Sequence, residues 1–346
     1  FRDLLLYFFV GLLVAFLRDR LDYVFHSESE IEKELKYPIL GRIPFIPIFE
    51  NFKGDEETYQ DKIEFINNTE SEKTYSSFYF KESFRSLYTS LTFLNSDKKI
   101  KVIIISSCLP SEGKSLINII FAQTLTELGK KVLLIDCDLR KPTLHKRLGL
   151  NNIQGITNFL SGKITNINDV IQNVPYIENL QVITSGITPP DPLRLLNSEK
   201  MKNLVEDLKN NSEFDYILID STPLVGLAET SVLANIGDGL IMLISMEGVE
   251  KSLPKKVLKD LTYKEINLLG IILNTKKLIK TFGSEFSYGY GYGYGYGYGY
   301  GYGNRIYASY SKNDKEETKI DNSKPNFFVK NGRTLINLIR GFISKL

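Results

Sequence analysis

The sequence of 346 residues lacks tryptophan and has only two cysteines, Cys108 and Cys137. Both lie in apolar, strand-like runs, so the sequence excludes a disulfide scaffold and favours a reduced cytoplasmic protein. An excess of either charge is also lacking, because 43 Lys and Arg balance 41 Asp and Glu. This balance gives no reason to expect a nucleic-acid partner. The chain begins with Phe1 rather than methionine, and we expect it to be a piece of a longer protein.

Residues 4–17 form an uncharged apolar run, LLLYFFVGLLVAFL. A signal peptide would need a basic start and a small-residue cleavage site, whereas Arg18 follows this run. The run is shorter than the ~20 residues that a bilayer core needs, but a helix that continues to Phe25 with snorkelling arginines is long enough. We therefore predict a transmembrane helix with its flank at residues 1–26; a buried helix is the alternative. Arg18 and Arg20 indicate that everything downstream is cytoplasmic.

Residues 27–80 are polar and acidic and contain Pro38, Pro44 and Pro47. They predict a cytoplasmic linker with one small extended segment, YPILGRIPFIP, at residues 37–47.

From residue 81 onward, apolar strands alternate with amphipathic helices. The predicted strands cover residues 101–107, 131–136, 179–186, 215–220, 239–245 and 268–274, and the predicted helices cover residues 81–94, 115–128, 197–209 and 251–262. This alternation predicts a mostly parallel sheet with helices on both faces. We expect a doubly wound α/β domain over residues 81–283.

The segment CLPSEGKS at residues 108–115 matches the P-loop template GxxxxGK[ST], except that Cys108 replaces the first glycine. Backbone N–H groups of such a loop converge on phosphate oxygens. We expect Lys114 to reach the β- and γ-phosphates of ATP and Ser115 to give its hydroxyl oxygen to Mg²⁺. The alternative is an ordinary strand-turn-helix. The predicted nucleotide-binding residues of the loop are Pro110, Ser111, Glu112, Gly113, Lys114 and Ser115.

Two other predicted strands end in carboxylates, one in Asp136 and Asp138 and the other in Asp220. Ligands of open α/β sheets bind at the carboxyl ends of the strands. Mg²⁺ bound to phosphates takes one or two carboxylates and waters. The aspartates therefore predict a metal–phosphate site, although either segment alone is also typical of a helix cap or turn.

The P-loop, LLIDCDLR at 133–140 and ILIDSTP at 217–223 together resemble the Walker A, A′ and B motifs of bacterial tyrosine kinases. These are the Wzc-type proteins of capsule and exopolysaccharide export. Asp-x-Asp-x-Arg is the specific element, since general P-loop ATPases lack it. The resemblance extends from about residue 4 to residue 310.

The resemblance implies a P-loop fold of the MinD/ParA type and ATP and Mg²⁺ as cofactors. It implies that Lys114, Asp136 and Asp138 are catalytic, with the two aspartates activating the acceptor tyrosine. Ser115, Asp136 and Asp220 would hold the metal, and Asn274 would face the adenine edge.

The resemblance also implies partners. Glu82 and Arg85 correspond to the start of the family's oligomerisation motif Glu-x-x-Arg-x-x-Arg, in which Tyr88 here replaces the second arginine. The expected assembly is a ring in which the tail of one subunit enters the next active site. The other expected partners are the polysaccharide polymerase and export machinery, a tyrosine phosphatase and the bacterial inner membrane.

Residues 284–310 contain eight tyrosines that alternate with glycine and then two more. Alternating glycine weakens a strand and buries no core, so we predict a flexible tail. The alternative is an aromatic linker. Beside a kinase site, the tail tyrosines are predicted phosphoacceptors, and each phosphate would add about −1.5 to −2 charge. They are Tyr288, Tyr290, Tyr292, Tyr294, Tyr296, Tyr298, Tyr300, Tyr302, Tyr307 and Tyr310.

Residues 311–346 predict a polar linker and an amphipathic helix at 333–346. Lying in a membrane interface and packing on the kinase domain are both open for this helix.

Two other functions share this sequence pattern. A MinD/ParA-like ATPase switch would want a second lysine near the start of the P-loop, where the chain has Ser107, Cys108 and Leu109. A catalytically silent polysaccharide co-polymerase would not need the intact set of Lys114 and the aspartates.

Overall fold

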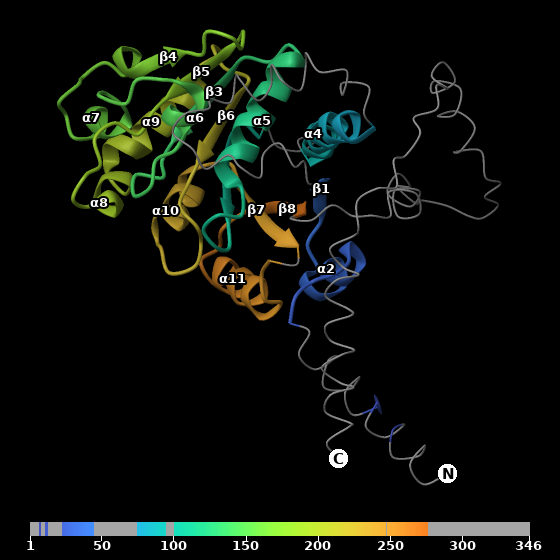
Figure 1. Cartoon of the computed structure of the whole chain (residues 1–346). Coiled ribbons are helices and arrows are strands. Elements are labelled where there is room, and N and C mark those ends of the chain that lie inside the picture. The colour runs from blue at the N-terminus through green and yellow to red at the C-terminus, as the bar shows by residue number, and fades with distance from the viewer. Residues whose placement is uncertain are drawn as a thin grey trace, which may run out of the picture. The chain divides into compact units, whose positions relative to one another are not determined.

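The computed structural model describes residues 23–44, 75–94, 100–246 and 248–275, together with Tyr7, Gly11 and Leu12. These residues contain an eight-stranded sheet with the order β1-β8-β7-β2-β6-β3-β5-β4 (Figure 1). The strands are β1 (Ile39–Ile43), β2 (Val102–Ser107), β3 (Val132–Asp136), β4 (Ile171–Asn173), β5 (Leu180–Ile183), β6 (Tyr216–Asp220), β7 (Gly239–Met246) and β8 (Leu268–Thr275). Every neighbouring pair is parallel except β4 and β5.

The helices connect the strands and cover both faces of the sheet (Figure 1). They are α2 (Glu28–Leu35), α4 (Tyr75–Leu94), α5 (Lys114–Glu127), α6 (Leu144–Leu148), α7 (Ile156–Leu160), the 3₁₀ helix η3 (Ile167–Val170), α8 (Pro192–Leu196), α9 (Glu199–Asn210), α10 (Glu229–Ile236) and α11 (Ser252–Tyr263). The prediction of a mostly parallel α/β sheet is confirmed, and each of the six predicted strands is present.

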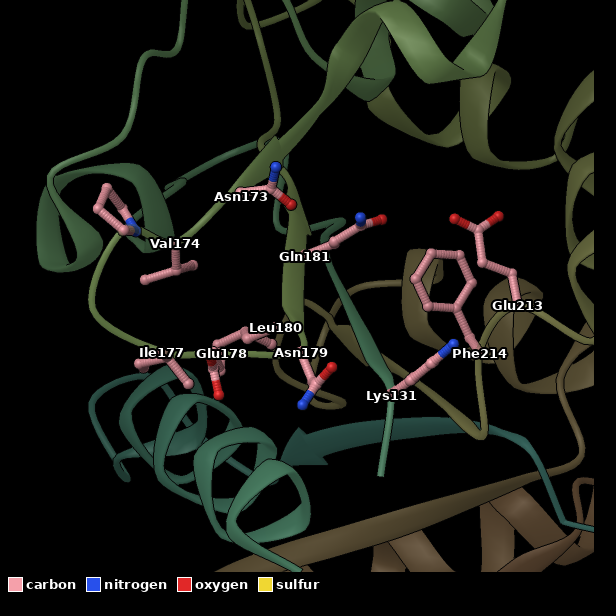
Figure 2. Close-up of a pocket in the computed structure, with 11 residues that line it drawn as sticks. Lys131, Asn173, Val174, Ile177, Glu178, Asn179, Leu180, Gln181, Glu213 and Phe214 are labelled. Atoms are coloured by element: carbon pink, nitrogen blue, oxygen red, sulfur yellow. The ribbon is translucent and has the colours of Figure 1, made fainter. Parts of the chain in front are cut away.

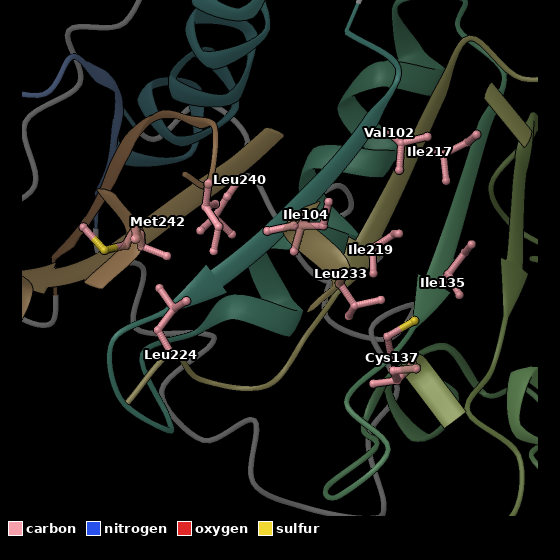
Figure 3. Packing of buried hydrophobic residues seen from close by; sticks show 14 of the residues in the cluster. Val102, Ile104, Ile135, Cys137, Ile217, Ile219, Leu224, Leu233, Leu240 and Met242 are labelled. Carbon is pink, nitrogen blue, oxygen red and sulfur yellow. The ribbon is translucent and has the colours of Figure 1, made fainter. Parts of the chain in front are cut away.

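The two faces of the sheet carry separate hydrophobic cores because successive strand side chains point to opposite faces. Val102 and Ile104 of β2 face a core shared with α7, α8, α9, α10 and α11. Figure 3 shows them beside Ile217 and Ile219 of β6, with which they are in register. Ile103 and Ile105 of β2 point to the other face, where they join a second core with α4, α5 and α6. Strands that are apolar on both sides are therefore explained by burial on both sides.

Strand β1 lies inside the segment that the sequence predicts to be a linker. It pairs in parallel with β8, with Ile39 beside Ile271 and Ile43 beside Asn274. The prediction of an extended segment there is confirmed, but β1 and α2 belong to the folded domain. Pro38 and Pro44 flank the strand, and proline is tolerated at the ends of an edge strand because it removes no ladder bond there.

The segment before β1 packs against α11. Lys251 N–H donates to the carbonyl oxygen of Tyr23 at 2.7 Å, and Val24 forms an antiparallel bridge with Glu250. Phe25 is only 1% exposed and lies in the core with α2. Ion pairs join Lys251 to Glu30 at 2.5 Å and Lys255 to Glu34 at 2.8 Å. The predicted continuation of the membrane helix to Phe25 is therefore wrong: Tyr23, Val24 and Phe25 are not helical, because they are paired and packed against the domain.

In the part of the chain that the structure describes, no helix is long and apolar enough to cross a membrane. Most of the predicted transmembrane helix lies outside the described residues, as do the tyrosine tail and the helix at 333–346. These segments, and the boundaries of the domains, stay predictions.

Replacing Phe25 with alanine should lower the free energy of unfolding by about 3 to 4 kcal/mol, because it removes a fully buried ring from the core. Chemical denaturation of the full chain measures this. Tyr23→Ala is the matched control, since its side chain is 55% exposed and should cost less than about 0.5 kcal/mol. Equal effects of the two variants would show that this segment does not dock as described.

Candidate active site

The phosphate loop lies between β2 and α5. Ser111 has φ +63° and Gly113 has φ +97°, so the loop contains two left-handed residues close together. Such a backbone turns successive N–H groups toward one point and forms an anion-binding concavity. A Cβ on Gly113 would also lie 2.9 Å from Asn274 Nδ2, so only glycine fits. Gly113 gives no side-chain cap to α5, which leaves the N–H groups of the first turn available to a ligand.

Glu112 fixes the loop from the inside. Its side chain is buried, and its Oε2 accepts the Leu109 N–H at 2.6 Å while its Oε1 accepts the Ser245 N–H at 2.8 Å. Asn274 Nδ2 donates to the Glu112 carbonyl oxygen at 2.8 Å. Two of the predicted nucleotide-binding residues therefore use their side chains to hold the loop in shape. That Asn274 also faces an adenine stays a prediction.

Cys108 fits the first position of the loop, where the P-loop template has glycine. Its backbone is not left-handed, so no glycine is needed there. The thiol is buried, with Sγ 3.8 Å from Met242 Sδ. Burial raises the pKa of the Cys108 thiol, which keeps it protonated. The residue therefore contributes packing to the loop.

Lys114 is the cation at the centre of the site. Its Nζ lies 2.7 Å from Asp138 Oδ2, 3.7 Å from Asp220 Oδ1 and 3.4 Å from Ser115 Oγ. Burial by itself lowers the pKa of Lys114, but Asp220 and Asp138 outweigh this effect and the net pKa is raised. The ammonium group is therefore charged at neutral pH. The structure brings together the lysine, the serine and the aspartates that the sequence predicts.

Asp136 and Asp220 end neighbouring strands and lie in register. Burial raises the pKa of both carboxyls, and the Asp220 charge adds to the rise for Asp136 while Lys114 opposes it. Asp136 accepts backbone N–H bonds from Asp138 and Leu144, each at 3.2 Å. Its carboxylate therefore also shapes the loop that carries Asp138.

The residues of the site fit Mg²⁺. Asp220 Oδ2 is buried and has no hydrogen-bond partner, and its Oδ1 faces Lys114, whose neighbour Ser115 carries a hydroxyl. Hard oxygen donors of this kind suit Mg²⁺, which takes one or two carboxylates and fills its shell with phosphate and water. No group of three His, Cys, Asp or Glu side chains in the described part of the chain is arranged to hold a metal by itself.

Asn118 is a site residue that the sequence reasoning missed. It is fully buried one turn into α5, and its Nδ2 donates to Asp220 Oδ1 at 3.0 Å and to the Lys114 carbonyl oxygen at 3.2 Å. The first of these bonds orients the Asp220 carboxylate and favours its charged form. A polar residue in the apolar run LINIIF was the available signal.

Arg140 is held by a partner far away in sequence. Its Nε lies 2.7 Å and its terminal nitrogen 2.5 Å from Glu229 Oε1 at the start of α10. Glu229 is buried, whereas the Arg140 side chain is about half exposed. The pair joins the segment after β3 to the helix after β6, and so fixes the rim of the site beside Asp138.

The predicted oligomerisation residues lie away from this cluster, on α4. Glu82 and Arg85 form an exposed ion pair at 3.8 Å. Tyr88, which stands where the family motif has its second arginine, packs edge-on against Tyr216 with ring centroids 6.2 Å apart. Tyr88 is therefore turned toward the domain. Ring assembly stays a prediction.

A cavity of about 440 Å³ lies at the opposite edge of the sheet. Figure 2 shows Lys131 and Phe214 on one side of it and Val174 and Ile177 on the other. Lys131 precedes β3 and Phe214 precedes β6, so the cavity is at the amino ends of these strands. None of the predicted site residues lines it.

The chain is similar to several known proteins. A family model described as an AAA domain matches residues 100–266. Tyrosine-protein kinase YwqD of Bacillus subtilis (strain 168) is 37% identical over 207 residues, which are 60% of this chain and 85% of the relative. Tyrosine-protein kinase CpsD of Streptococcus agalactiae is 32% identical over 212 residues, which are 60% of this chain and 89% of the relative.

Solved structures of two other proteins are also similar to this chain. The chimerical protein CapA2B2 has 28% identity and a TM-score of 0.60, over 72% of this chain and 98% of that one. The BceF tyrosine kinase domain has 25% identity and a TM-score of 0.61, over 73% of this chain and 99% of that one. The likeness therefore covers nearly the whole length of these domains.

Asn118→Leu should weaken Mg²⁺-dependent ATP binding by about tenfold near pH 6 and less at pH 8. The variant removes a hydrogen bond that favours ionised Asp220, so the pKa of this carboxyl rises further and less of it is charged at the lower pH. Calorimetric titration of Mg²⁺–ATP at several pH values measures the effect.

Thr124→Val is the matched control for Asn118→Leu. It removes a buried hydrogen bond to the Ile120 carbonyl oxygen, farther along the same helix. Mg²⁺–ATP binding should stay within twofold of the unmodified chain in this control. The same pH dependence in both variants would contradict a specific role for Asn118.

Proposed function

The chain belongs to the family of bacterial tyrosine-protein kinases, and on this basis we propose that it transfers the γ-phosphoryl group of ATP to tyrosines of its own tail, residues 284–310. The observation that carries the proposal is the contact of Lys114 with Asp138 and Asp220 at the mouth of the phosphate loop. This set joins a phosphate-binding cation to a carboxylate that can take a proton. Tyrosine transfer needs both.

The loop binds and orients the nucleotide in this mechanism. The N–H groups around Ser111 and Gly113 bind phosphate oxygens, and Glu112 keeps the loop in that shape. Ser115 and Asp220 are the residues that would hold Mg²⁺, which when bound supplies charge neutralisation at the phosphates. The Asp220 Oδ2 atom without a hydrogen-bond partner supports this role.

Lys114 changes partners when a nucleotide enters. In the structure its ammonium group pairs with Asp138 at 2.7 Å. A γ-phosphate carries more negative charge than one carboxylate, so Lys114 turns to it and stabilises the charge of the transferring group. Asp138 Oδ2 is then released from the ion pair and can accept a hydrogen bond from the phenol O–H of the acceptor tyrosine. Nucleotide binding thus prepares the base.

In the transfer step, Asp138 takes the proton and ADP is the leaving group. The phenol O–H proton of the acceptor tyrosine moves to Asp138 Oδ2. The phenol oxygen forms a bond to the γ-phosphorus, and the bond from this phosphorus to the β–γ bridging oxygen breaks. ADP leaves with the electron pair of that bond, and phosphotyrosine is the product.

Assembly of the subunits controls the kinase in the proposed function. The subunits form a ring, and the tail of one subunit enters the site of the next. Phosphates on the tail add negative charge near Asp136 and Asp138, which repels the tail and dissociates the ring. A tyrosine phosphatase resets it, and the cycle regulates polysaccharide polymerisation and export at the bacterial inner membrane, with the kinase domain in the cytoplasm. The sequence resemblance and the ten tail tyrosines support this setting.

Lys114→Met should abolish phosphotyrosine on the tail, because the γ-phosphate loses its cation. The fold should persist, since burial raises the pKa of Asp220 and this carboxyl can take up a proton when the lysine is gone. Immunoblotting with an antibody to phosphotyrosine, together with circular dichroism, measures both results. Lys131→Met, an exposed lysine at the other edge of the sheet, should leave the signal unchanged. An undiminished signal in Lys114→Met would refute the assignment of the loop.

Transfer between subunits should be visible when two defective chains are mixed. One is Lys114→Met, which keeps its tail, and the other is an active kinase that lacks residues 287–310. Labelled ATP should mark the tail of the first chain, because the second supplies the active site. If that tail stays unlabelled while the shortened kinase phosphorylates an added tyrosine peptide, transfer between subunits is wrong.

A further inference from the structure

Two isoleucines are exposed on neighbouring loops, one after α6 and one after β5. Ile153 is 70% exposed on the loop after α6, and Ile187 is 58% exposed on the loop after β5. The two loops are joined by Asn152, whose Nδ2 donates to the Gly186 carbonyl oxygen at 3.1 Å and whose Oδ1 accepts the Gly186 N–H at 2.9 Å. Ile153 and Ile187 therefore flank one fixed contact. We call this pair the apolar shelf.

The apolar shelf lies at the same edge of the sheet as the catalytic carboxylates. Ile183 ends β5 and is in register with Ile135 of β3, the residue before Asp136. Thr184 Oγ1, which follows β5, lies 3.1 Å from the Asn151 carbonyl oxygen and 3.2 Å from that of Gln154, and its one O–H can donate to either. The loop that carries Ile153 is thus fixed to the carboxyl end of β5. By chain reach, Ile187 lies within ~14 Å of the end of β5, and β5 lies ~5 Å from β3.

We propose that the apolar shelf binds tyrosine rings of the Tyr–Gly tract, residues 288–303, of a second copy of the chain while a neighbouring tyrosine of that tract occupies the active site. This inference rests on the proposed function and names how its substrate is recognised. It makes Ile153 and Ile187 determinants of acceptor specificity.

The spacing of the tract fits this arrangement. In an extended chain, residues i and i+2 point to the same side and lie ~7 Å apart, so tyrosines i+2 and i+4 are ~7 and ~14 Å from the acceptor. The regular repeat lets one tyrosine contact the shelf while another occupies the active site over a range of separations between the two. The glycines between the tyrosines carry no side chain, so the backbone of the tract can approach the rim of the site closely.

The chemistry of the two surfaces also matches. Residues 288–303 contain only tyrosine and glycine and carry no charge, and the shelf is apolar. A tyrosine ring covers a large apolar area when it packs on an aliphatic side chain. A phosphotyrosine carries about −1.5 to −2 charge and does not suit this surface. The shelf therefore prefers unmodified tyrosines and weakens its hold as phosphorylation proceeds.

The test uses the full chain in which the ten tail tyrosines are changed to serine, so that an added peptide is the acceptor. Three peptides of residues 287–303 are compared. The first peptide has the native sequence. The second keeps Tyr294 and has phenylalanine in place of every other tyrosine. The third keeps Tyr294 and has serine in place of every other tyrosine. Phosphate transfer to each is measured for KM and kcat.

The KM of the Tyr→Ser peptide should be about tenfold higher than that of the Tyr→Phe peptide, with similar kcat, because the shelf binds rings and not hydroxyls. In the double variant Ile153→Ser, Ile187→Ser this difference should disappear. Tyr263→Ser is the matched control, since Tyr263 is 87% exposed at the end of α11, and it should keep the tenfold difference.

The outcomes separate this inference from the proposed function. Equal KM values for the two single-tyrosine peptides, measured on the chain with both isoleucines intact, would refute ring binding by the shelf. Phosphate transfer to the peptides would still support the proposed kinase activity. A tenfold difference that survives in the double variant also overturns the shelf, because the rings are then bound elsewhere. Absence of transfer to every peptide, with ATP and Mg²⁺ present, overturns both.

Discussion

Asp136 and Asp220 lie side by side at the ends of two buried strands, and this arrangement needs a cation. Two carboxylates at such a distance cannot both be charged in a low-dielectric setting unless a positive group lies between or beside them. Lys114 is that group in the structure. The parallel register of β3 and β6 brings the two carboxylates together, and Lys114, directly after the loop that follows β2, provides the positive charge. The strand pairing that builds the sheet therefore also assembles the charged groups of the site.

The loop keeps its shape without a ligand because its supports come from other strands. Glu112 binds the backbone of Ser245 at the end of β7, and Asn274 at the end of β8 binds the backbone of Glu112. Both supports lie on the side of the sheet away from Asp136. The concavity is therefore pre-organised, and little ordering is left for a nucleotide to impose.

Much of this site could be predicted from the sequence, because its residues follow strands in a recognisable pattern. Lys114, Asp138 and Asp220 were placed by motif, and the carboxyl ends of parallel strands meet at one edge. Contacts between residues far apart along the chain could not be found this way. The bond from Ser245 to Glu112 and the pair of Arg140 with Glu229 depend on which strands are neighbours.

Local pattern also failed where one residue departs from its surroundings. Asn118 is a single polar residue in an apolar helix, and nothing in its spacing says that Asp220 lies opposite. Strand β1 is short and lies between two prolines within a polar segment, so its place in the sheet could not be read from composition. Tyr88 was noted as a departure from a motif, but its packing on Tyr216 needed the structure.

The two cysteines have a consequence for inhibitor design. Cys108 lies in the phosphate loop and Cys137 lies between Asp136 and Asp138, positions that would suit a covalent compound aimed at sulfur. Both are fully buried, and burial raises the pKa of each thiol, so neither is a thiolate at neutral pH. Because the thiolate is the nucleophile in alkylation, electrophilic compounds would find no reactive sulfur here. Compounds against this site could therefore not rely on alkylation of either cysteine.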